Sequence, residues 1–144
     1  MRIIVTGSRT WTDYPVLAEA LEGVVRWTTG PHTLVSGACP NGADALAEHW
    51  AENAAAMGYP WTVERHPADW ERHAKGAGAI RNQAMIDLDA DLVVGFVSAC
   101  TNPPTSRCWS RGTHASHGTV DCLRKALDAG IPILTRTDMP RKSA

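Results

Sequence analysis

The chain has 144 residues, the length of one domain, with a formal net charge of −1 and interspersed acidic and basic residues. This charge pattern lacks the basic stripe that nucleic-acid binders usually carry. No segment approaches the roughly 20 apolar residues needed to cross a bilayer, and the start "MRIIVTGSRTW" lacks the pattern of a signal peptide. We therefore expect a cytoplasmic protein with no membrane association.

Strand and helix patterns alternate along the chain. Short runs rich in apolar and β-branched residues predict strands, and apolar positions at helical spacing predict the helices between them. In chain order the predicted elements are the strand "RIIVTG", a helix from Pro15, the strand "HTLVSG", a helix from Ala43 to a cap at Gly58, the strand "WTVERH", a helix from about Ala79 to Leu88, the strand "DLVVGFV", a helix carrying Val120, Leu123 and Leu127, and the strand "IPILT".

This alternation predicts a single α/β domain over residues 1–137, followed by a flexible tail at 138–144. Five strands separated by helices indicate a doubly wound, Rossmann-like fold, with a mainly parallel sheet flanked by helices. Right-handed crossovers favour the strand order 3-2-1-4-5. Ligands of such sheets bind beyond the carboxyl ends of the strands, where the strand order reverses. Functional residues should therefore follow the strands.

Glycine-rich and polar segments do follow the strands. The segment "SGACPNGAD" could hold an anion on its backbone N–H groups and the following helix N-terminus, although an ordinary strand-to-helix turn is the alternative. Arg9 offers a phosphate contact, and Trp70 a stacking face or, alternatively, a core anchor. The predicted ligand-binding residues are Gly7, Ser8, Arg9, Ser36, Gly37, Gly42, Asp44, Asp69, Trp70, Arg81, Asn82, Gly118 and Thr119.

The cysteines show no C-x-x-C spacing, and in a cytosolic chain they are most simply reduced thiols. Cys100, Cys108, His114 and His117 occur within one stretch, but their spacing fits no common structural-zinc pattern. We therefore expect scattered thiols and loop histidines, with no metal site and no cofactor.

The ordered motifs "GSR", "SGACPNGAD", "ADW", "AGAIRNQAM" and "HGT" resemble the SLOG superfamily of Rossmann-like nucleotide-binding domains, and most closely its YspA-type branch. The resemblance runs from Arg2 to about Leu134. It implies a nucleotide or nucleotide-derived ligand between the loop after the second strand, the Arg-Asn helix and the Gly-Thr turn.

The related LOG-type phosphoribohydrolases cleave the bond between base and ribose phosphate, with an arginine on the third helix and a glutamate after a Gly-Thr turn. Arg81 is similar to that arginine, but Cys122 stands where the glutamate is expected. Asp121 precedes it by one residue, which rotates an acid by about 100° on a helix. If the chain is an enzyme, Arg81 and Asp121 are the catalytic candidates, with Asp44 or Asp69 as substitutes for the acid.

Three functions therefore remain in view. The first is a sensor or processing domain that binds a nucleotide-derived small molecule. The second is a hydrolase acting on the N-glycosidic or phosphate bond of a nucleoside monophosphate or an ADP-ribose-like ligand. The third, by resemblance to the DprA branch, is a single-stranded DNA binder, which the absence of a basic groove disfavours. A homo-oligomer formed through Trp27 or residues 98–117 stays open.

Overall fold

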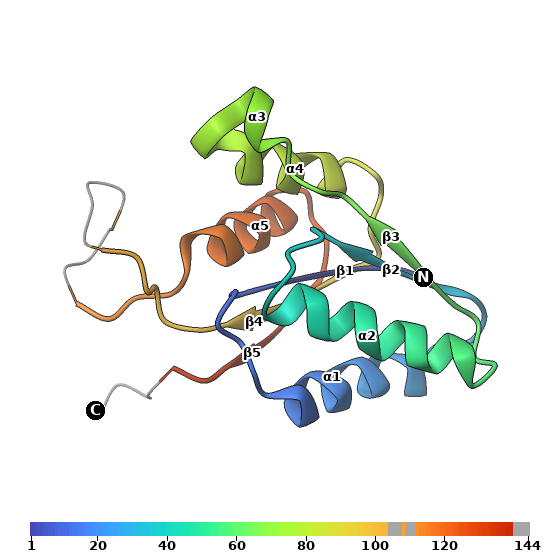
Figure 1. The fold of residues 1–144 in the computed structure, drawn as a ribbon. Coiled ribbons are helices and arrows are strands. Elements are labelled where there is room, and N and C mark those ends of the chain that lie inside the picture. The colour runs from blue at the N-terminus through green and yellow to red at the C-terminus, as the bar shows by residue number, and fades with distance from the viewer. Residues whose placement is uncertain (104–107, 109–111, 140–144) are drawn as a thin grey trace.

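The fold is described from a computed structural model that covers residues 1–103, 108 and 112–139. A five-stranded sheet forms its centre (Figure 1). The strands are β1 (Arg2–Gly7), β2 (His32–Ser36), β3 (Trp61–Arg65), β4 (Leu92–Val97) and β5 (Ile133–Thr137). All four pairings are parallel and the order is β3-β2-β1-β4-β5, so the predicted α/β architecture and strand order are confirmed.

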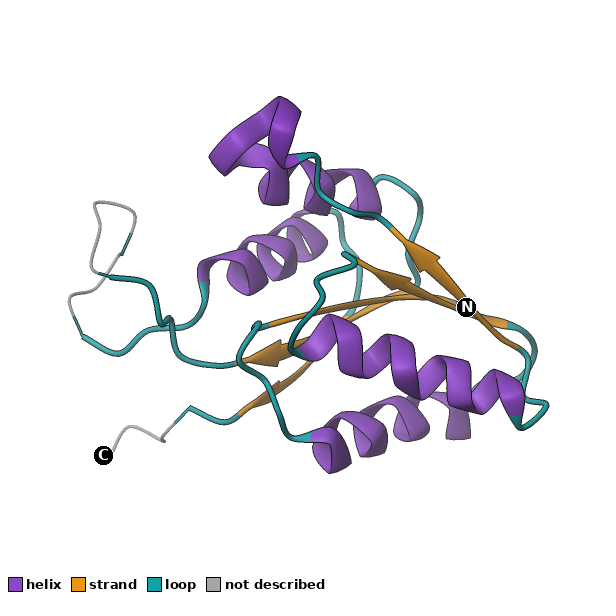
Figure 2. Cartoon of the chain, in the orientation of Figure 1, coloured by secondary structure: helices purple, strands orange, loops and turns teal. Residues whose placement is uncertain are grey.

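Helices cover both faces of the sheet (Figure 2). α1 and α2 pack on one face, and α4 and α5 on the other. The helices are α1 (Tyr14–Arg26), α2 (Ala43–Ala56), α3 (Trp70–His73), α4 (Ala77–Ile86) and α5 (His117–Asp128), with the 3-10 turn η1 (Ala74–Gly76) between α3 and α4. Within the described ranges, no helix is long and apolar enough to cross a membrane.

Two hydrophobic layers hold the helices to the sheet. Alternate residues of β1 point to opposite faces, so Ile3 and Val5 enter the layer beneath α1 and α2, whereas Ile4 enters the layer beneath α4 and α5. Trp50, on α2, is buried and meets Trp61 edge-on, with ring centroids 5.0 Å apart. The layers hold the helices against the sheet, and because all the strand pairs are parallel, the carboxyl ends of the strands share one edge of the sheet.

The segment between β3 and α4 differs from the prediction. A loop was expected up to about Ala79, but α3 forms within it and α4 begins two residues early. The Asp69 Oδ1 accepts a hydrogen bond from the Arg72 N–H at 3.0 Å, which caps α3. Arg81 consequently lies in the second turn of α4 rather than at its start. Of the predicted tail, residues 140–144 lie outside the described part of the chain.

Candidate functional site

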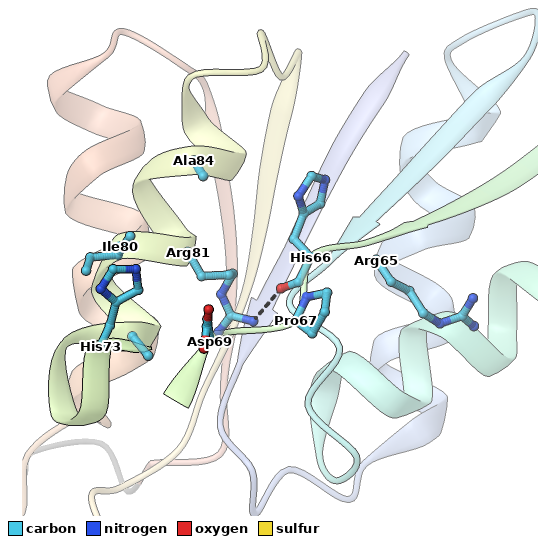
Figure 3. Close-up of a pocket in the computed structure, with 9 residues that line it drawn as sticks. Arg65, His66, Pro67, Asp69, His73, Ile80, Arg81 and Ala84 are labelled. Carbon is cyan, nitrogen blue, oxygen red and sulfur yellow. Dashed lines mark hydrogen bonds between the residues drawn. The ribbon is translucent and has the colours of Figure 1, made fainter. Parts of the chain in front are cut away.

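Arg81 reaches from α4 to the carboxyl ends of two strands. Its Nη1 donates to the Gly37 carbonyl, just after β2, and to the His66 carbonyl, just after β3, the latter at 3.3 Å (Figure 3). Its Nε donates to the Asn82 Oδ1 at 3.1 Å. Among the described residues, Arg81 Nη2 makes no hydrogen bond. The Arg81 side chain is half-buried.

The loops after β1 and β2 meet at Gly42, the N-cap residue of α2. Gly42 has a φ of 75°, in the left-handed region that favours glycine. A Cβ at this position would overlap the Ser8 carbonyl oxygen and lie 2.5 Å from the Arg9 Cα. The Ala43 N–H donates to the same Ser8 carbonyl at 3.2 Å. Glycine is therefore required at position 42 for the contact between the two loops, independently of any ligand.

Asp44 places a carboxylate near the point where the loops after β1 and β2 meet. Asp44 lies in the first turn of α2 and is only 5% exposed. Its Oδ2 accepts a hydrogen bond from the Cys39 N–H at 3.3 Å. Burial raises the pKa of Asp44 to about 6, against the opposing effects of the Cys39 N–H and the positive charges of Arg81 and Arg9. A buried carboxylate of this kind is commonly found at functional sites.

A chain of hydroxyl groups joins β1, β4 and α5 at the point where the strand order reverses. The Ser98 N–H donates to the Ser8 Oγ at 2.9 Å, and the Ser8 and Ser116 Oγ atoms lie 2.8 Å apart. Ser116, the N-cap residue of α5, is in turn 2.7 Å from the Thr119 Oγ1. Thr119 is buried and is not the N-cap. A phosphate contact through its hydroxyl would require this hydrogen bond to open.

Asn82 connects α4 to α5 instead of facing the crevice. It is 3% exposed, and its Nδ2 donates to the Gly118 carbonyl at 3.2 Å and to the Asp121 Oδ2 at 2.9 Å. The Lys125 Nζ also donates to that carboxylate oxygen, at 2.8 Å, and to the Ala79 carbonyl, at 2.7 Å. Asp121, the proposed catalytic acid, is thus held within a helix-to-helix connection.

We predict that Asn82→Ala lowers the free energy of unfolding by about 2 kcal/mol, because it removes a buried amide that bonds to the Gly118 carbonyl and the Asp121 carboxylate on α5. Gln83→Ala, one position along the same helix, removes an exposed hydrogen bond to Asp87 and is expected to cost no more than about 0.5 kcal/mol. Urea unfolding of both variants measures the difference. Equal midpoints for the two would show that the Asn82 connection contributes nothing to stability.

Cys122 lies in the second turn of α5, beneath this connection. It is fully buried, and desolvation raises the pKa of its thiol to about 11, although a hydrogen bond with Thr6 opposes the shift. The side chain is consequently a neutral thiol at neutral pH. An uncharged group at this position cannot stabilise the positive charge that develops during glycosidic cleavage, as a carboxylate would.

Arg9, in the loop after β1, contacts Trp70, the first residue of α3. The Arg9 Cζ lies 5.8 Å from the centre of the Trp70 ring, in a cation–π contact. Trp70 is 50% exposed, so its alternative interpretation as a core anchor is wrong. A Cβ at Gly78, in the first turn of α4, would be 3.6 Å from the edge of the ring. An aromatic face therefore stands beside the N-terminus of α4.

A pocket of about 260 Å³ opens beside Arg81, between the end of β3 and α4 (Figure 3). Of the predicted site residues, Asp69 and Arg81 line it. Arg65 also borders the pocket, but its side chain points away from the other labelled residues in Figure 3 and pairs with Glu48 and Glu52 on α2. The lining residues are Arg65, His66, Pro67, Asp69, His73, Ala77, Ile80, Arg81 and Ala84.

The structure brings the predicted loops together at one edge of the sheet. Gly42 contacts the loop after β1, Arg81 contacts Gly37, and Asn82 contacts Gly118. Two further predicted residues have structural partners. Gly7 lets α2 and β4 approach β1, since a Cβ there would overlap the Ala43 Cβ and lie 2.9 Å from the Phe96 carbonyl oxygen. The Ser36 hydroxyl bonds to Glu48 at 2.5 Å. Whether any of these residues binds a ligand stays a prediction.

Sequence reasoning missed several residues of this region. Ser116, Lys125, Glu48 and His66 act as hydrogen-bond partners of predicted residues, His66 through its backbone carbonyl. Position was the only sequence signal: His66 follows β3, Ser116 is the N-cap residue of α5, and Glu48 lies in the second turn of α2. Lys125, in the last turn of α5, had no such signal. The expectation that the cysteines and loop histidines are scattered is wrong: ligand atoms of Cys100, Cys108, His114 and His117 all lie within 4.8 Å of one another.

Comparisons with known proteins give a family. A family model described as "YspA, cpYpsA-related SLOG family" matches residues 1–73, which end just before α4. The Gene 61 protein of Mycobacterium phage D29 is 35% identical over 139 residues, covering 96% of this chain and 98% of that protein. No solved structure matches.

Proposed function

Because this chain belongs to the YspA, cpYpsA-related SLOG family, we propose that it binds a nucleotide or nucleotide-derived small molecule at the carboxyl edge of its sheet. Family membership suggests a nucleotide-related ligand. The observation that carries the proposal is the position of Arg81, whose guanidinium is held by carbonyl groups after β2 and β3 at the wall of a pocket. The proposed role is that of a sensor or processing domain.

Arg81 is the proposed phosphate contact. Its Nη1 and Nε are engaged with the protein, which fixes the plane of the guanidinium before a ligand arrives. The Nη2 group retains donors for an anionic oxygen, and a charge-assisted hydrogen bond from a half-buried arginine is stronger than one made in bulk water. A fixed donor also loses little conformational entropy when it binds.

The neighbouring side chains suit the remainder of a nucleotide. Asp69 borders the same pocket and offers carboxylate oxygens to sugar hydroxyl groups. Trp70 presents an exposed ring on which a base can stack, with a contribution of about 1–3 kcal/mol by analogy with single-stranded nucleic acids. Phosphate, sugar and base would therefore each have a partner.

Binding without glycosidic cleavage is favoured by the residues near Gly118. Cys122 is a buried neutral thiol, and Asp121 is bonded to Asn82 and Lys125. The Cys122 thiol carries no charge, and the Asp121 carboxylate is already bonded, so neither is a free carboxylate that could stabilise an oxocarbenium-like transition state. These contacts support a domain that holds its ligand intact.

A ligand panel tests the proposal. The protein is titrated by calorimetry with AMP, ADP, ATP, ADP-ribose and NAD, and each mixture is chromatographed for released base. We predict that at least one compound binds and that no base appears. Arg81→Ala is expected to raise the Kd of that compound by about 10- to 100-fold, the loss of one charge-assisted contact.

Arg124→Ala is the matched control, because Arg124 is an exposed arginine on α5 that is not among the residues lining the pocket. It should leave the Kd unchanged. Thermal melting of both variants separates folding from binding, since Arg81 also holds two backbone carbonyls and its removal is expected to cost about 1–2 kcal/mol of stability. A folded Arg81→Ala protein with wild-type affinity would contradict the proposal, and base released by the wild type would favour the hydrolase.

A further inference from the structure

Four metal-binding side chains meet between β4 and α5. Cys100, Cys108, His114 and His117 each offer one ligand atom, and these four atoms all lie within 4.8 Å of one another. Zinc bonds of about 2.3 Å to sulfur and 2.0–2.1 Å to nitrogen place the corners of a tetrahedral site about 3.3–3.8 Å apart. The cluster is therefore already close to the size that a zinc ion requires.

The two histidines are arranged as metal ligands would be. Their Nε2 atoms are 3.1 Å apart, which is close to the edge between two nitrogen ligands of tetrahedral zinc. The His114 Nδ1 lies 2.8 Å from the Gly112 carbonyl oxygen, to which it can only donate. This bond assigns the proton of the neutral ring to Nδ1, the usual support for a ligating histidine. The Nε2 atom, which faces the His117 Nε2, then carries a lone pair that can bind a metal in place of that contact.

The backbone holds three of the four ligands independently of any ion. Ala99 and Ala115 form an antiparallel bridge, and the Cys100 N–H donates to the His114 carbonyl at 2.7 Å. His117 is the first residue of α5, beside the N-cap Ser116. Cys100, His114 and His117 are thus positioned by a bridge and a helix, and Cys108 completes the set.

We propose that Cys100, Cys108, His114 and His117 bind one zinc ion in a structural site. Two thiolates and two neutral imidazoles are a Cys2His2 set, and the thiolate charges balance that of Zn²⁺. Four protein ligands leave no position for water, so the site stabilises the chain and performs no chemistry. The ion would tie residues 98–117 to the start of α5, adjacent to Gly118, and this inference does not depend on the proposed ligand.

Metal analysis tests the site directly. The full chain, purified without chelators or added metal, is measured by mass spectrometry for bound metals, and we expect about one zinc ion per chain. After removal of the zinc, Co²⁺ is added; tetrahedral coordination by thiolates should give intense visible ligand-field bands and a sulfur-to-cobalt charge-transfer band. Chelation is expected to lower the melting temperature of the wild type, because metal binding is coupled to folding.

Cys100→Ser is expected to weaken zinc binding by at least about 100-fold and to lower the intensity of the sulfur-to-cobalt charge-transfer band, because one thiolate, that of Cys108, remains. Cys39→Ser is the matched control, because Cys39 is another partly exposed cysteine that lies outside the cluster. It should retain zinc and remain sensitive to chelators. If Cys100→Ser fails to fold, His114→Ala provides the same comparison.

Three results would overturn the site. One is a wild-type protein that stays free of metal after incubation with excess zinc under reducing conditions. A second is equal zinc affinity in the wild type, Cys100→Ser and His114→Ala. The third is a titration of the denatured, unreduced protein that finds two thiols instead of four, with the missing pair mapped by peptide analysis to a disulfide between Cys100 and Cys108.

Discussion

Replacing Gly42 by alanine is expected to lower the free energy of unfolding by about 3 kcal/mol or more. The residue has a φ of 75°, and an added Cβ would overlap the Ser8 carbonyl oxygen and lie 2.5 Å from the Arg9 Cα. Those obstructing atoms are backbone, so a rotamer change cannot relieve the contact. Chemical denaturation followed by circular dichroism gives the change in stability.

Gly118→Ala is the matched control. Gly118 also follows a loop and lies in the first turn of a helix, but its φ is not positive. Apart from its chain neighbours and the backbone of its own helix, no described residue has an atom within 4 Å of the place that an added Cβ would take. Alanine is expected to leave stability unchanged or raise it by up to about 1 kcal/mol, because glycine is the poorer helix former. If the two variants lost equal stability, the close contact at Gly42 would not explain the result.

Asp44→Asn is expected to stabilise the protein at neutral pH by about 2–3 kcal/mol. The carboxyl has a pKa of about 6 in the folded state, above its ordinary value of 3.8, so the folded chain binds this proton more tightly than the unfolded chain. Its contribution to stability is therefore greatest at low pH and is lost as the pH rises from about 4 to 6. Asparagine keeps the shape of the side chain and removes the buried charge.

The measurement is the difference in unfolding free energy between Asp44→Asn and wild type from pH 4.5 to 8. This difference should grow with pH and level off above about pH 7. Glu22→Gln, at an exposed position on α1, is the matched control, because it replaces a carboxylate that is not buried. A flat difference for Asp44→Asn would show that burial does not penalise its charge. If Asp44 also holds the ligand, the more stable variant will bind more weakly, as expected of a functional residue kept at a cost to stability.

The fold was predictable because its signals are local and repeated. β-branched strand runs alternate with helical spacing, and the handedness of crossovers leaves few arrangements of five such strands. The prediction was wrong for one local segment, the one that forms α3. Residues 70–76 carry no apolar periodicity, so nothing indicated α3 except Asp69, whose carboxylate caps a helix of only four residues. Short helices of this kind depend on capping more than on an apolar face.

The site was predictable in place but not in detail. Parallel strands bring their carboxyl ends to one edge, which is why Gly37, Gly42 and Arg81 could be expected together from widely separated motifs. Which polar residues are satisfied internally could not be foreseen. Asn82 is an amide on a glycine-rich helix, and only the packing of α5 shows that its partners are Gly118 and Asp121.

The cysteine and histidine cluster was missed for a different reason. The intervals of seven, five and two residues between successive ligands match none of the usual zinc patterns. What brings the ligands together is the bridge between Ala99 and Ala115, a contact across 15 residues that a spacing rule does not include. Spacing rules describe ligands carried on short turns, whereas here the bridge between Ala99 and Ala115 brings the ligands together.

The anchoring of Arg81 by main-chain carbonyls affects how this protein can diverge from its relatives. Every residue type has a carbonyl, so the chain after β3 can exchange His66 for other side chains without releasing the guanidinium. Position 37 lacks that freedom, because any Cβ there would occupy the space of the Arg81 side chain. If the proposed ligand binds at this pocket, residues at the pocket rim can change and alter which ligand is preferred while Arg81 stays in position.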